Sequence, residues 1–498
     1  MALVDEKLNV VASTLQPYAE PVVSPHPGWR EQNPLVWWQA VEEGIRELVK
    51  SAGDSRLIRA IGLTGQMHGL TALDRQGEVV RPCIVYSDLR NSEQCIQITD
   101  KAGGAEEYYR KTGNRMISAC TGATMLWMKQ NEPELFEKTV VVVSPKDYIR
   151  YRLTGGMATD VSDASGFGVF DVAHRIWNDE LIREIGLPRE IFPKAHESVE
   201  IVGEVLPAVA ERLGIPIGVR VAAGGGDAAV QPLGSGALAK AGAFTSTIGT
   251  SGFVSGLFDH YVPDKNGALQ MICANESGHW TAHGGATAGL ALMWLEKVFF
   301  AEERHVAELL GENVYEILDR EAAMAPPGSN GLLFYPMLFG QRCPEPDNHA
   351  KGCFVGINMQ HDKRHFFRSA LEGVALGIKV CARLLEKMDA NNNIKSMNIN
   401  GGGASSRLWC QIMADIFGVE IRRPVHYTNG GSIGAAMIAG TGAGLWSSLK
   451  EASSLIEIGL RVEPDQSNSD MYEKLEQAYS AIHPSLKQVF PILAQIAK

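Results

Sequence analysis

The apolar residues of this chain follow two alternating spacings along most of its length. In residues 34–49 they return every three or four positions, which predicts an amphipathic helix. Short continuous apolar runs predict buried strands instead, at residues 57–63, 139–143, 219–223, 242–248 and 397–400. Further helices are expected to open at residues 145 and 430, and to occupy 288–300, 364–387, 407–417 and parts of 469–497. Strands that alternate with helices indicate an α/β fold.

This alternation occurs twice, which indicates two α/β halves. The first pattern ends near Leu238 and the second begins near Ala241. We therefore place a first domain at residues 1–240 and a second at residues 241–498. A chain of 498 residues is long enough to give each half its own core. A ligand would lie in the cleft between the two halves.

Charge and composition narrow the range of functions. A formal net charge of −11 and a pI near 5.7 argue against a nucleic-acid or anionic-membrane partner. No stretch reaches the roughly 20 apolar residues that span a bilayer. Residues 1–7 carry charges where a signal peptide would be apolar. The eight cysteines form no CxxC pair and no zinc-binding spacing, so we expect reduced thiols in a cytoplasmic protein.

Two glycine-rich segments carry the candidate chemistry. Gly224, Gly225 and Gly226 follow a strand-like run and precede Asp227, so another molecule can approach the backbone beside a single carboxylate. Residues 246–252 form a turn rich in Gly, Ser and Thr, whose backbone N–H groups can bind an anion. One base beside a phosphate cradle suits phosphoryl transfer to a hydroxyl. Taken alone, the two segments also fit ordinary glycine-bearing strand ends of an α/β protein.

Several short motifs occur in a characteristic order. The main ones are Gly65–Gly69, Gly226–Asp227, Thr247–Thr250 and Gly401–Ser405. Between them lie Tyr86–Arg90, Lys146–Tyr148, Ala158–Ser165 and the spaced Gly, Arg and Glu-Gly elements of Gly340–Gly373. Together they resemble the FGGY family of carbohydrate kinases, and most closely its xylulokinase branch. The resemblance extends from about residue 2 to about residue 446, and it is specific because independent motifs share one order.

The resemblance implies a fold, a reaction and its substrates. The fold would be α/β, with two ribonuclease-H-like domains of the actin and hexokinase superfamily that close over an interdomain cleft. The reaction would transfer the γ-phosphate of ATP, with Mg²⁺, to a terminal hydroxyl of a ketopentose, xylulose before others. The alternatives are a kinase for another ketose or a polyol, and an inactive sugar- or nucleotide-binding regulator. The sequence determines neither which sugar is the substrate nor the oligomeric state, so a monomer and a homodimer are both compatible with it.

The resemblance also assigns residues to the sugar side of the cleft. It makes Asp227 the general base that takes the proton of the attacking hydroxyl, with a helix-capping or turn Asp as the alternative. Gln66, Met67 and His68 follow a strand-like run, where loops of open α/β sheets carry ligands, and would touch the sugar. Without the resemblance, a Met-His pair is more often core packing.

Four further polar residues have weaker assignments. Asp88 and Arg90 would contact the sugar or support closure, and an exposed ion pair is the rival interpretation. Thr124 stands where the family commonly has Lys, and Asn429 where a Glu is common. The last two departures would shift substrate preference without removing the chemistry.

On the nucleotide side, the resemblance points to glycines and one arginine. Gly249 and Thr250 would cradle the phosphates of ATP, with a plain hairpin as the alternative. Gly403 would let the backbone approach the adenine closely, and Arg407 would contact the base or ribose. Gly289 matches a further adenosine-side glycine, for which a helix-packing glycine is the competing explanation.

The family's opening strand and its Asp-x-Gly-Thr phosphate turn have no counterpart in this sequence. Residues 2–12 resemble the family's second strand and the segment that follows it. Without the opening strand, neighbouring strands would expose ladder groups, and phosphate positioning would be weakened. We therefore expect the 498-residue chain to be a poor kinase beside a version extended upstream with such a segment. An incomplete gene model and a natural pseudokinase are the two explanations.

Overall fold

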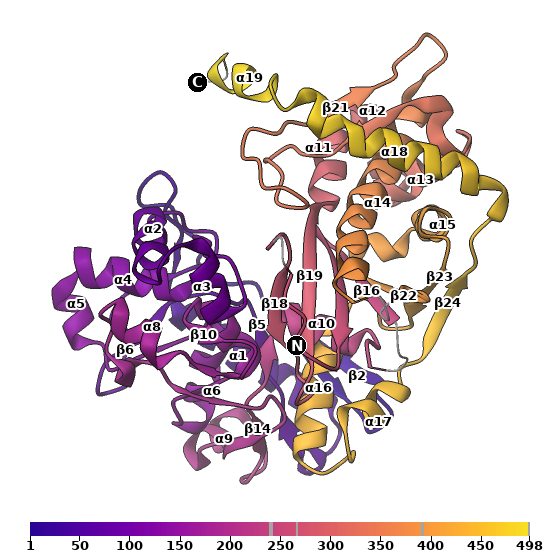
Figure 1. Cartoon of the computed structure of the whole chain (residues 1–498). Coiled ribbons are helices and arrows are strands. Elements are labelled where there is room, and N and C mark those ends of the chain that lie inside the picture. Colours follow the sequence, from indigo (N-terminus) through magenta and orange to yellow (C-terminus); the bar gives the residue numbers. More distant parts are fainter. Residues whose placement is uncertain (239–242, 265–266, 390–392, 497–498) are drawn as a thin grey trace.

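The chain forms two lobes. The structure is a computed structural model that describes residues 1–238, 243–264, 267–389 and 393–496. In Figure 1 the first half of the chain, in indigo to magenta, lies beside the second half, in rose to yellow. The expected boundary between residues 240 and 241 falls outside the described residues. Within the described ranges, no helix combines the length and apolar character that crossing a membrane requires.

A seven-stranded sheet forms the core of the second lobe. Its strand order is β18-β19-β17-β16-β22-β23-β24. The central strands β16, β22 and β23 run parallel, and the flanking pairs are antiparallel. The strands are β16 Ala243–Ile248, β17 Ser251–Phe258, β18 Gln270–Cys273, β19 Trp280–Thr287, β22 Ser396–Asn400, β23 Glu420–Pro424 and β24 Ile458–Val462.

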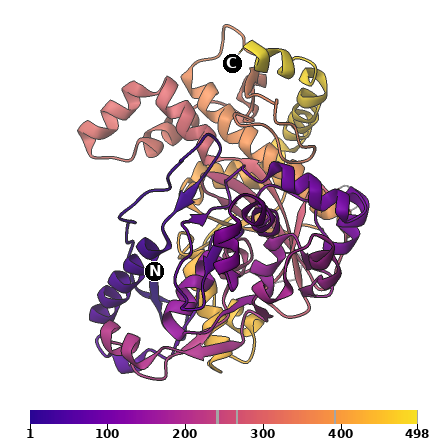
Figure 2. The same ribbon diagram turned by 90° about the vertical axis from the view of Figure 1, so that its left-hand side faces the viewer.

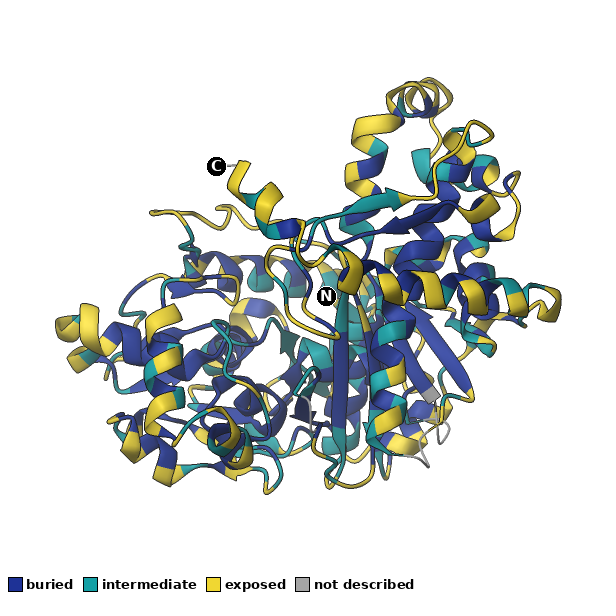
Figure 3. Cartoon of the chain, turned by 45° about the horizontal axis from the view of Figure 1, so that its top comes forward, coloured by how far each residue is buried: buried dark blue, intermediate teal, exposed yellow. Residues whose placement is uncertain are grey.

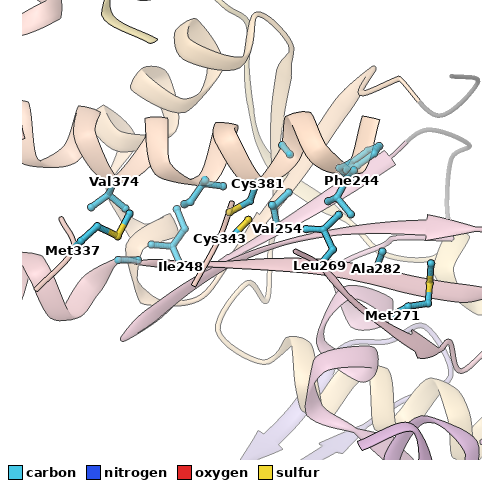
Figure 4. Close-up of a cluster of buried hydrophobic side chains, with 14 of the residues drawn as sticks. Phe244, Ile248, Val254, Leu269, Met271, Ala282, Met337, Cys343, Val374 and Cys381 are labelled. Carbon is cyan, nitrogen blue, oxygen red and sulfur yellow. The ribbon is translucent and has the colours of Figure 1, made fainter. Parts of the chain in front are cut away.

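The long helix α14 (Lys363–Met388) covers one face of this sheet. Its side chains Val374 and Cys381 lie toward Ile248 and neighbouring strand residues (Figure 4). The packing is close, because a Cβ on Gly284 of β19 would lie only 2.7 Å from the Cβ of Cys381. The apolar periodicity that predicted a helix at 364–387 therefore marks the side that is buried against the sheet.

Smaller elements surround this core. The other helices of the second half are α11 Gly289–Phe299, α12 Ala301–Leu310, α13 Val314–Ala322, α15 Arg407–Phe417, α16 Gly430–Gly442, α17 Leu449–Ser454, α18 Ser469–Leu486 and α19 Phe490–Ile496. A separate strand pair joins β20 Leu333–Tyr335 to β21 Cys353–Val355. Figure 2 shows the α12–α13 pair, in salmon, projecting from the upper lobe.

The first lobe contains short strand pairs surrounded by helices. Two parallel pairs matter for the site: β14 (Arg220–Ala222) with β4 (Ala60–Ile61), and β15 (Gly225–Gly226) with β5 (Thr64–Gly65). The other strands are β1 Ala2–Val4, β2 Val10–Ser13, β3 Glu31–Gln32, β6 Thr71–Leu73, β7 Cys83–Ile84, β8 Val141–Val143, β9 Ala158–Asp160, β10 Phe170–Asp171, β11 Ile176–Trp177, β12 Lys194–His196 and β13 Ile201–Glu204.

The helices of this lobe bury their inner faces against these strands. Figure 3 shows the strands mostly buried, while the outer faces of the helices are exposed. The helices are α1 Pro34–Ser51, α2 Ser92–Lys101, α3 Ala105–Thr112, α4 Thr121–Asn131, α5 Pro133–Lys138, α6 Pro145–Thr154, α7 Val161–Ala164, α8 Asp179–Glu184, α9 Pro207–Leu213 and α10 Asp227–Gly234.

Helix α16 belongs to the second half of the sequence but packs on the first lobe. Its Ile433 and Ala435 are buried in one cluster with Val230 and Leu233 of α10. A Cβ on Gly234 would collide with the backbone of α16, so only glycine allows this approach. The small residues of 430–436 were predicted to suit close helix packing, and the structure confirms that prediction.

In the first half of the chain, one predicted strand has the wrong extent, and one expectation about the sheet stays a prediction. The strand expected at 57–63 is wrong at both ends. Leu57 ends a short 3-10 helix and the ladder begins only at Ala60, and it breaks after Ile61, where the backbone of Gly62 packs against the carbonyl of Ala435. The hairpin of β1 and β2 shares no ladder with the β13-β14-β4 sheet in the described part of the chain. That a further strand would complete this sheet stays a prediction.

Candidate active site

Asp227 lies directly beside the segment that contains Met67 and His68. Strand β15 pairs with β5 in parallel, with Gly226 opposite Gly65, so the residues that follow both strands leave the ladder side by side. The backbone N–H groups of Ala228 and Met67 lie close enough to the carboxylate of Asp227 to lower its pKa. The structure therefore brings together the predicted base and the predicted sugar residues, which are far apart in the sequence.

The environment of Asp227 suits a base at neutral pH. Asp227 is the first residue of α10, and the capping position before it is occupied by Gly226. Burial raises the pKa of the Asp227 carboxyl to about 6, against backbone hydrogen bonds that lower it. A carboxylate with this pKa is ionised at neutral pH but binds a proton more readily than an ordinary Asp.

Met67 forms an apolar contact next to this carboxylate. Its side chain is 5% exposed and packs against Ala229 and against Ile272 of the second lobe. A Cβ on Gly226 would lie 2.5 Å from the Cγ of Met67, so the third glycine before Asp227 leaves room for Met67. The glycine therefore serves the protein's own packing beside the base.

His68 presents one ring nitrogen to the site. Its φ of 67° lies in the left-handed region, which is uncommon outside glycine and frequent at functional positions. Its Nδ1 lies 2.9 Å from the carbonyl oxygen of Gly166 and donates to it, which leaves Nε2 as an acceptor. Burial lowers the pKa of the imidazole, so the ring is neutral. Gln66 is half-buried beside it.

A buried group of charges lies behind these residues. The ammonium of Lys146 is 2.5 Å from Asp147, 2.9 Å from Asp160 and 3.1 Å from Asp163. Burial alone would lower the pKa of Lys146, but the three carboxyl groups outweigh it and raise the pKa. Burial and the neighbouring carboxylates raise the pKa of Asp163 to about 8. Arg150, 2.6 Å from Asp147, completes what we call the Lys146 cluster.

The Lys146 cluster holds the backbone that carries Asp227. Lys146 and Arg150 donate to the carbonyl of Ala223 at 3.3 Å and 3.1 Å. The hydroxyl of Ser162 accepts a hydrogen bond from the N–H of Gly226 at 2.9 Å. The segments Lys146–Tyr148 and Ala158–Ser165 support the family resemblance, but no role was predicted for their charged residues. Their density of charged residues next to apolar runs was the signal that could have indicated a buried network.

Asp88 and Arg90 pair with each other. Arg90 donates to both oxygens of Asp88 at 2.8 Å, and its side chain is only 1% exposed. The guanidinium also pairs with Glu31 and lies 3.7 Å from the ring centroid of Trp29. The ion pair considered as the rival interpretation is thus present, but buried rather than exposed. No described hydrogen bond or ion pair joins it to Met67 or His68, and a role in sugar binding stays a prediction.

Gly249, Thr250 and Gly289 come together at the end of β16. The turn expected at 246–252 is shorter than predicted, because residues 246–248 belong to β16 and residues 251–252 to β17. Residues 249–250 form the tight turn of this hairpin, which was the alternative interpretation of the segment. The N–H of Gly289 donates to the Gly249 carbonyl, and that of Leu290 to the Thr250 carbonyl, both at 2.9 Å. A Cβ on Gly289 would lie 2.5 Å from the Gly249 oxygen, so this glycine packs against the turn. Phosphate binding by the turn stays a prediction.

Gly403 lies next to this hairpin, in the turn after β22. A Cβ on Gly403 would collide with Ile248 and lie 2.7 Å from the ring of Trp409. The protein's own packing therefore requires glycine there, in addition to any approach by an adenine ring. Gly402, by contrast, faces open space, because no atom of a non-adjacent described residue lies within 4 Å of a Cβ. Arg407 is exposed at the first position of α15.

The sequence of this chain matches the models of one known protein family over most of its length. The model of the FGGY family of carbohydrate kinases, N-terminal domain, matches residues 1–234, and that of the C-terminal domain matches residues 244–443. The chain belongs to the FGGY family of carbohydrate kinases. This FGGY kinase is a phosphotransferase with an alcohol group as acceptor, and a sugar and ATP are its small-molecule substrates.

Relatives cover nearly the whole chain. The xylulose kinase of Staphylococcus epidermidis is 35% identical over 98% of this chain and 94% of its own length. The gluconokinase of Bacillus subtilis is 29% identical over 91% of this chain and 88% of its own. The crystal structure of a xyloylose kinase from Brucella ovis superposes with a TM-score of 0.88 at 30% identity, covering 98% of this chain and 97% of that one. These similarities confirm the expected two-domain fold of the actin and hexokinase type.

Proposed function

We propose that this FGGY kinase transfers the γ-phosphate of ATP to a terminal hydroxyl of a ketopentose, with xylulose as the first candidate. The observation that carries the proposal is the position of Asp227 beside Met67 and the neutral His68. The similarity to the xylulose kinase of Staphylococcus epidermidis supports a ketopentose as substrate. The gluconokinase relative supports the second candidate, a sugar acid.

In the proposed reaction, each residue acts on one part of the substrates. Asp227 takes the proton from the attacking hydroxyl as that oxygen approaches the γ-phosphate. His68 accepts a hydrogen bond from another hydroxyl through Nε2, and Met67 packs on the apolar side of the sugar. Closure of the two lobes excludes water, which limits hydrolysis of ATP.

Mg²⁺ would enter with ATP. In the described ranges, no three His, Cys, Asp or Glu side chains are arranged to hold a metal ion. The residues present therefore fit a cation that arrives bound to the nucleotide phosphates, where it neutralises charge. The turns at 249–250 and 401–403 would supply backbone contacts to the same nucleotide.

A substrate panel tests the proposal. Xylulose, other ketoses, polyols and gluconate are each given with ATP, and ADP release is followed by a coupled assay. We expect the highest kcat/KM for a ketopentose. A preference for gluconate or a polyol would contradict the assignment. Sugar binding without any sugar-dependent ADP release would instead identify a binding regulator.

His68→Ala should raise the sugar KM about tenfold or more while the KM for ATP changes little. The substitution removes one hydrogen bond to one substrate, worth about 0.5–1.5 kcal/mol, and the apolar surface of the ring. His305→Ala, at an exposed histidine, is the matched control. An unchanged sugar KM would remove His68 from the site, and equal changes for both substrates would indicate a folding defect.

Gly402→Val should weaken ATP binding while the melting temperature stays near that of the wild type. The Cβ of the added side chain has no atom of a non-adjacent described residue within 4 Å, so a loss of affinity reports a ligand that approaches this turn. Gly403→Val is the comparison, and it should also lower the melting temperature because its Cβ meets Ile248 and Trp409. Wild-type nucleotide affinity in Gly402→Val would place the adenosine pocket elsewhere.

A further inference from the structure

His283 on β19 is a buried histidine with an unused ring nitrogen. Its side chain is 8% exposed, and its Nε2 lies 3.1 Å from Oε1 of Gln270. Nδ1 is buried and has no hydrogen-bond partner among the residues that the structure describes. A buried polar atom without a partner costs about 1–3 kcal/mol, so native structures rarely keep one without a reason.

The strand register places His283 on the side of the sheet that faces the sugar residues. His283 lies opposite Gln270, and Thr281 lies opposite Ile272. Because side chains alternate along a strand, Gln270, Ile272 and His283 share one face. Ile272 on that face is buried in one cluster with Met67 and Ala229 of the first lobe. His283 and His68 also interact electrostatically, since burial lowers the pKa of His283 to about 4 and His68 adds to that effect.

The first lobe fixes the position of this face. The side-chain amide of Asn114 donates to the carbonyl of Met271 at 2.7 Å and accepts from its N–H at 2.8 Å. The hydroxyl of Ser165 accepts a hydrogen bond from the N–H of Cys273 at 3.1 Å. Strand β18 is the edge strand of the seven-stranded sheet, and its free edge is thus bound by the first lobe. His283, on the neighbouring strand, is held at a defined place relative to His68.

The hydrogen bonds define what the two histidines can bind. Because Oε1 of Gln270 accepts, Nε2 of His283 carries the proton and Nδ1 is an acceptor. His68 likewise offers Nε2 as an acceptor. Together with the carboxylate of Asp227, the site offers acceptors from both lobes. Hydroxyl groups donate to such acceptors, whereas a carboxylate, which only accepts, would be repelled.

We propose that His283 is a substrate-binding residue of the second lobe, whose Nδ1 accepts a hydrogen bond from a hydroxyl of a neutral sugar bound at His68. The proposal rests on the proposed function and deepens it, because it favours a neutral ketose or polyol over a sugar acid. It also gives the sugar one contact that only the closed arrangement of the two lobes supplies.

A pair of variants at this position tests the proposal by direct binding. His283→Leu keeps the approximate volume and removes the acceptor, whereas His283→Asn keeps an acceptor at the position of Nδ1. In calorimetric titration without ATP, Leu should weaken xylulose binding roughly 3- to 10-fold, as expected for one neutral hydrogen bond. Asn should stay within about twofold of wild type, and both variants should bind a non-hydrolysable ATP analogue normally.

Deoxy sugars make the test specific to one hydroxyl. Among monodeoxy analogues of xylulose, the one that lacks the hydroxyl bound by His283 should bind wild type and His283→Leu equally, while the others keep the difference. Unchanged xylulose affinity in His283→Leu would overturn the inference, as would equal losses for sugar and ATP analogue. Wild-type preference for gluconate in binding would also overturn it. Failure of the proposed function is seen separately, as absence of ketose-dependent ADP release in wild type.

Discussion

Asp227→Asn should lower kcat about 10²–10⁴-fold while sugar and ATP still bind. The amide has the size of the carboxylate and fills the same position at the start of α10, but it cannot take the proton of the attacking hydroxyl. Burial raises the pKa of Asp227 to about 6 in the folded protein, so the ionised carboxylate lowers the free energy of unfolding at neutral pH. The variant should therefore be at least as stable as wild type at pH 7.5, and a lower rate would not reflect unfolding.

Asp100→Asn is the matched control, because Asp100 is an exposed carboxylate away from the site. Its kcat should equal that of wild type. Near-normal turnover in a folded Asp227→Asn protein would show that another group acts as the base. Parallel loss of ATP and sugar binding would instead indicate that the side chain maintains the structure of the cleft.

Lys146→Met should lower the free energy of unfolding by about 3–5 kcal/mol. With Asp163 protonated near neutral pH, Lys146 and Arg150 face the two remaining carboxyl groups, Asp147 and Asp160. Removing the ammonium leaves the buried Asp160 without its paired cation and Asp147 with Arg150 alone, and it also removes a donor to the Ala223 carbonyl. Such a loss is far more costly than breaking a surface pair.

Urea denaturation of Lys146→Met and of Lys194→Met, an exposed lysine of β12, measures this difference. The control should unfold within about 0.5 kcal/mol of wild type. If both variants unfold alike, the Lys146 cluster does not stabilise the first lobe. A stable Lys146→Met protein with lowered kcat would still indicate that the cluster positions the backbone of Asp227.

The elements that could be predicted from the sequence are those with strong local signals. The helix at Arg407–Phe417 was predicted to its exact bounds because its apolar period is regular, and Ser406 caps it. The strand at 57–63 was overextended because its end is decided by α16, which lies far away in the sequence. Local periodicity carries no information about such a contact.

In the site, too, contacts between residues far apart in the sequence could not be predicted from local patterns. Asp227 and Gly226 were found from a local motif, and the packing reason for the glycine, contact with Met67, needed the structure. Gly403 was assigned to the adenosine pocket, although its collision partners are Ile248 and Trp409. The Lys146 cluster and His283 were not predicted, because their burial results from segments that meet only in the fold.

The pH dependence of kcat/KM for xylulose tests the assignment of Asp227 most directly. The base must be deprotonated in the free enzyme, so the rate should fall as pH falls below about 6, tenfold per pH unit at low pH. This limb should be absent from the residual activity of Asp227→Asn. A wild-type profile that stays flat down to pH 4.5, or a limb that persists in the variant, would contradict the assignment of Asp227 as the catalytic base.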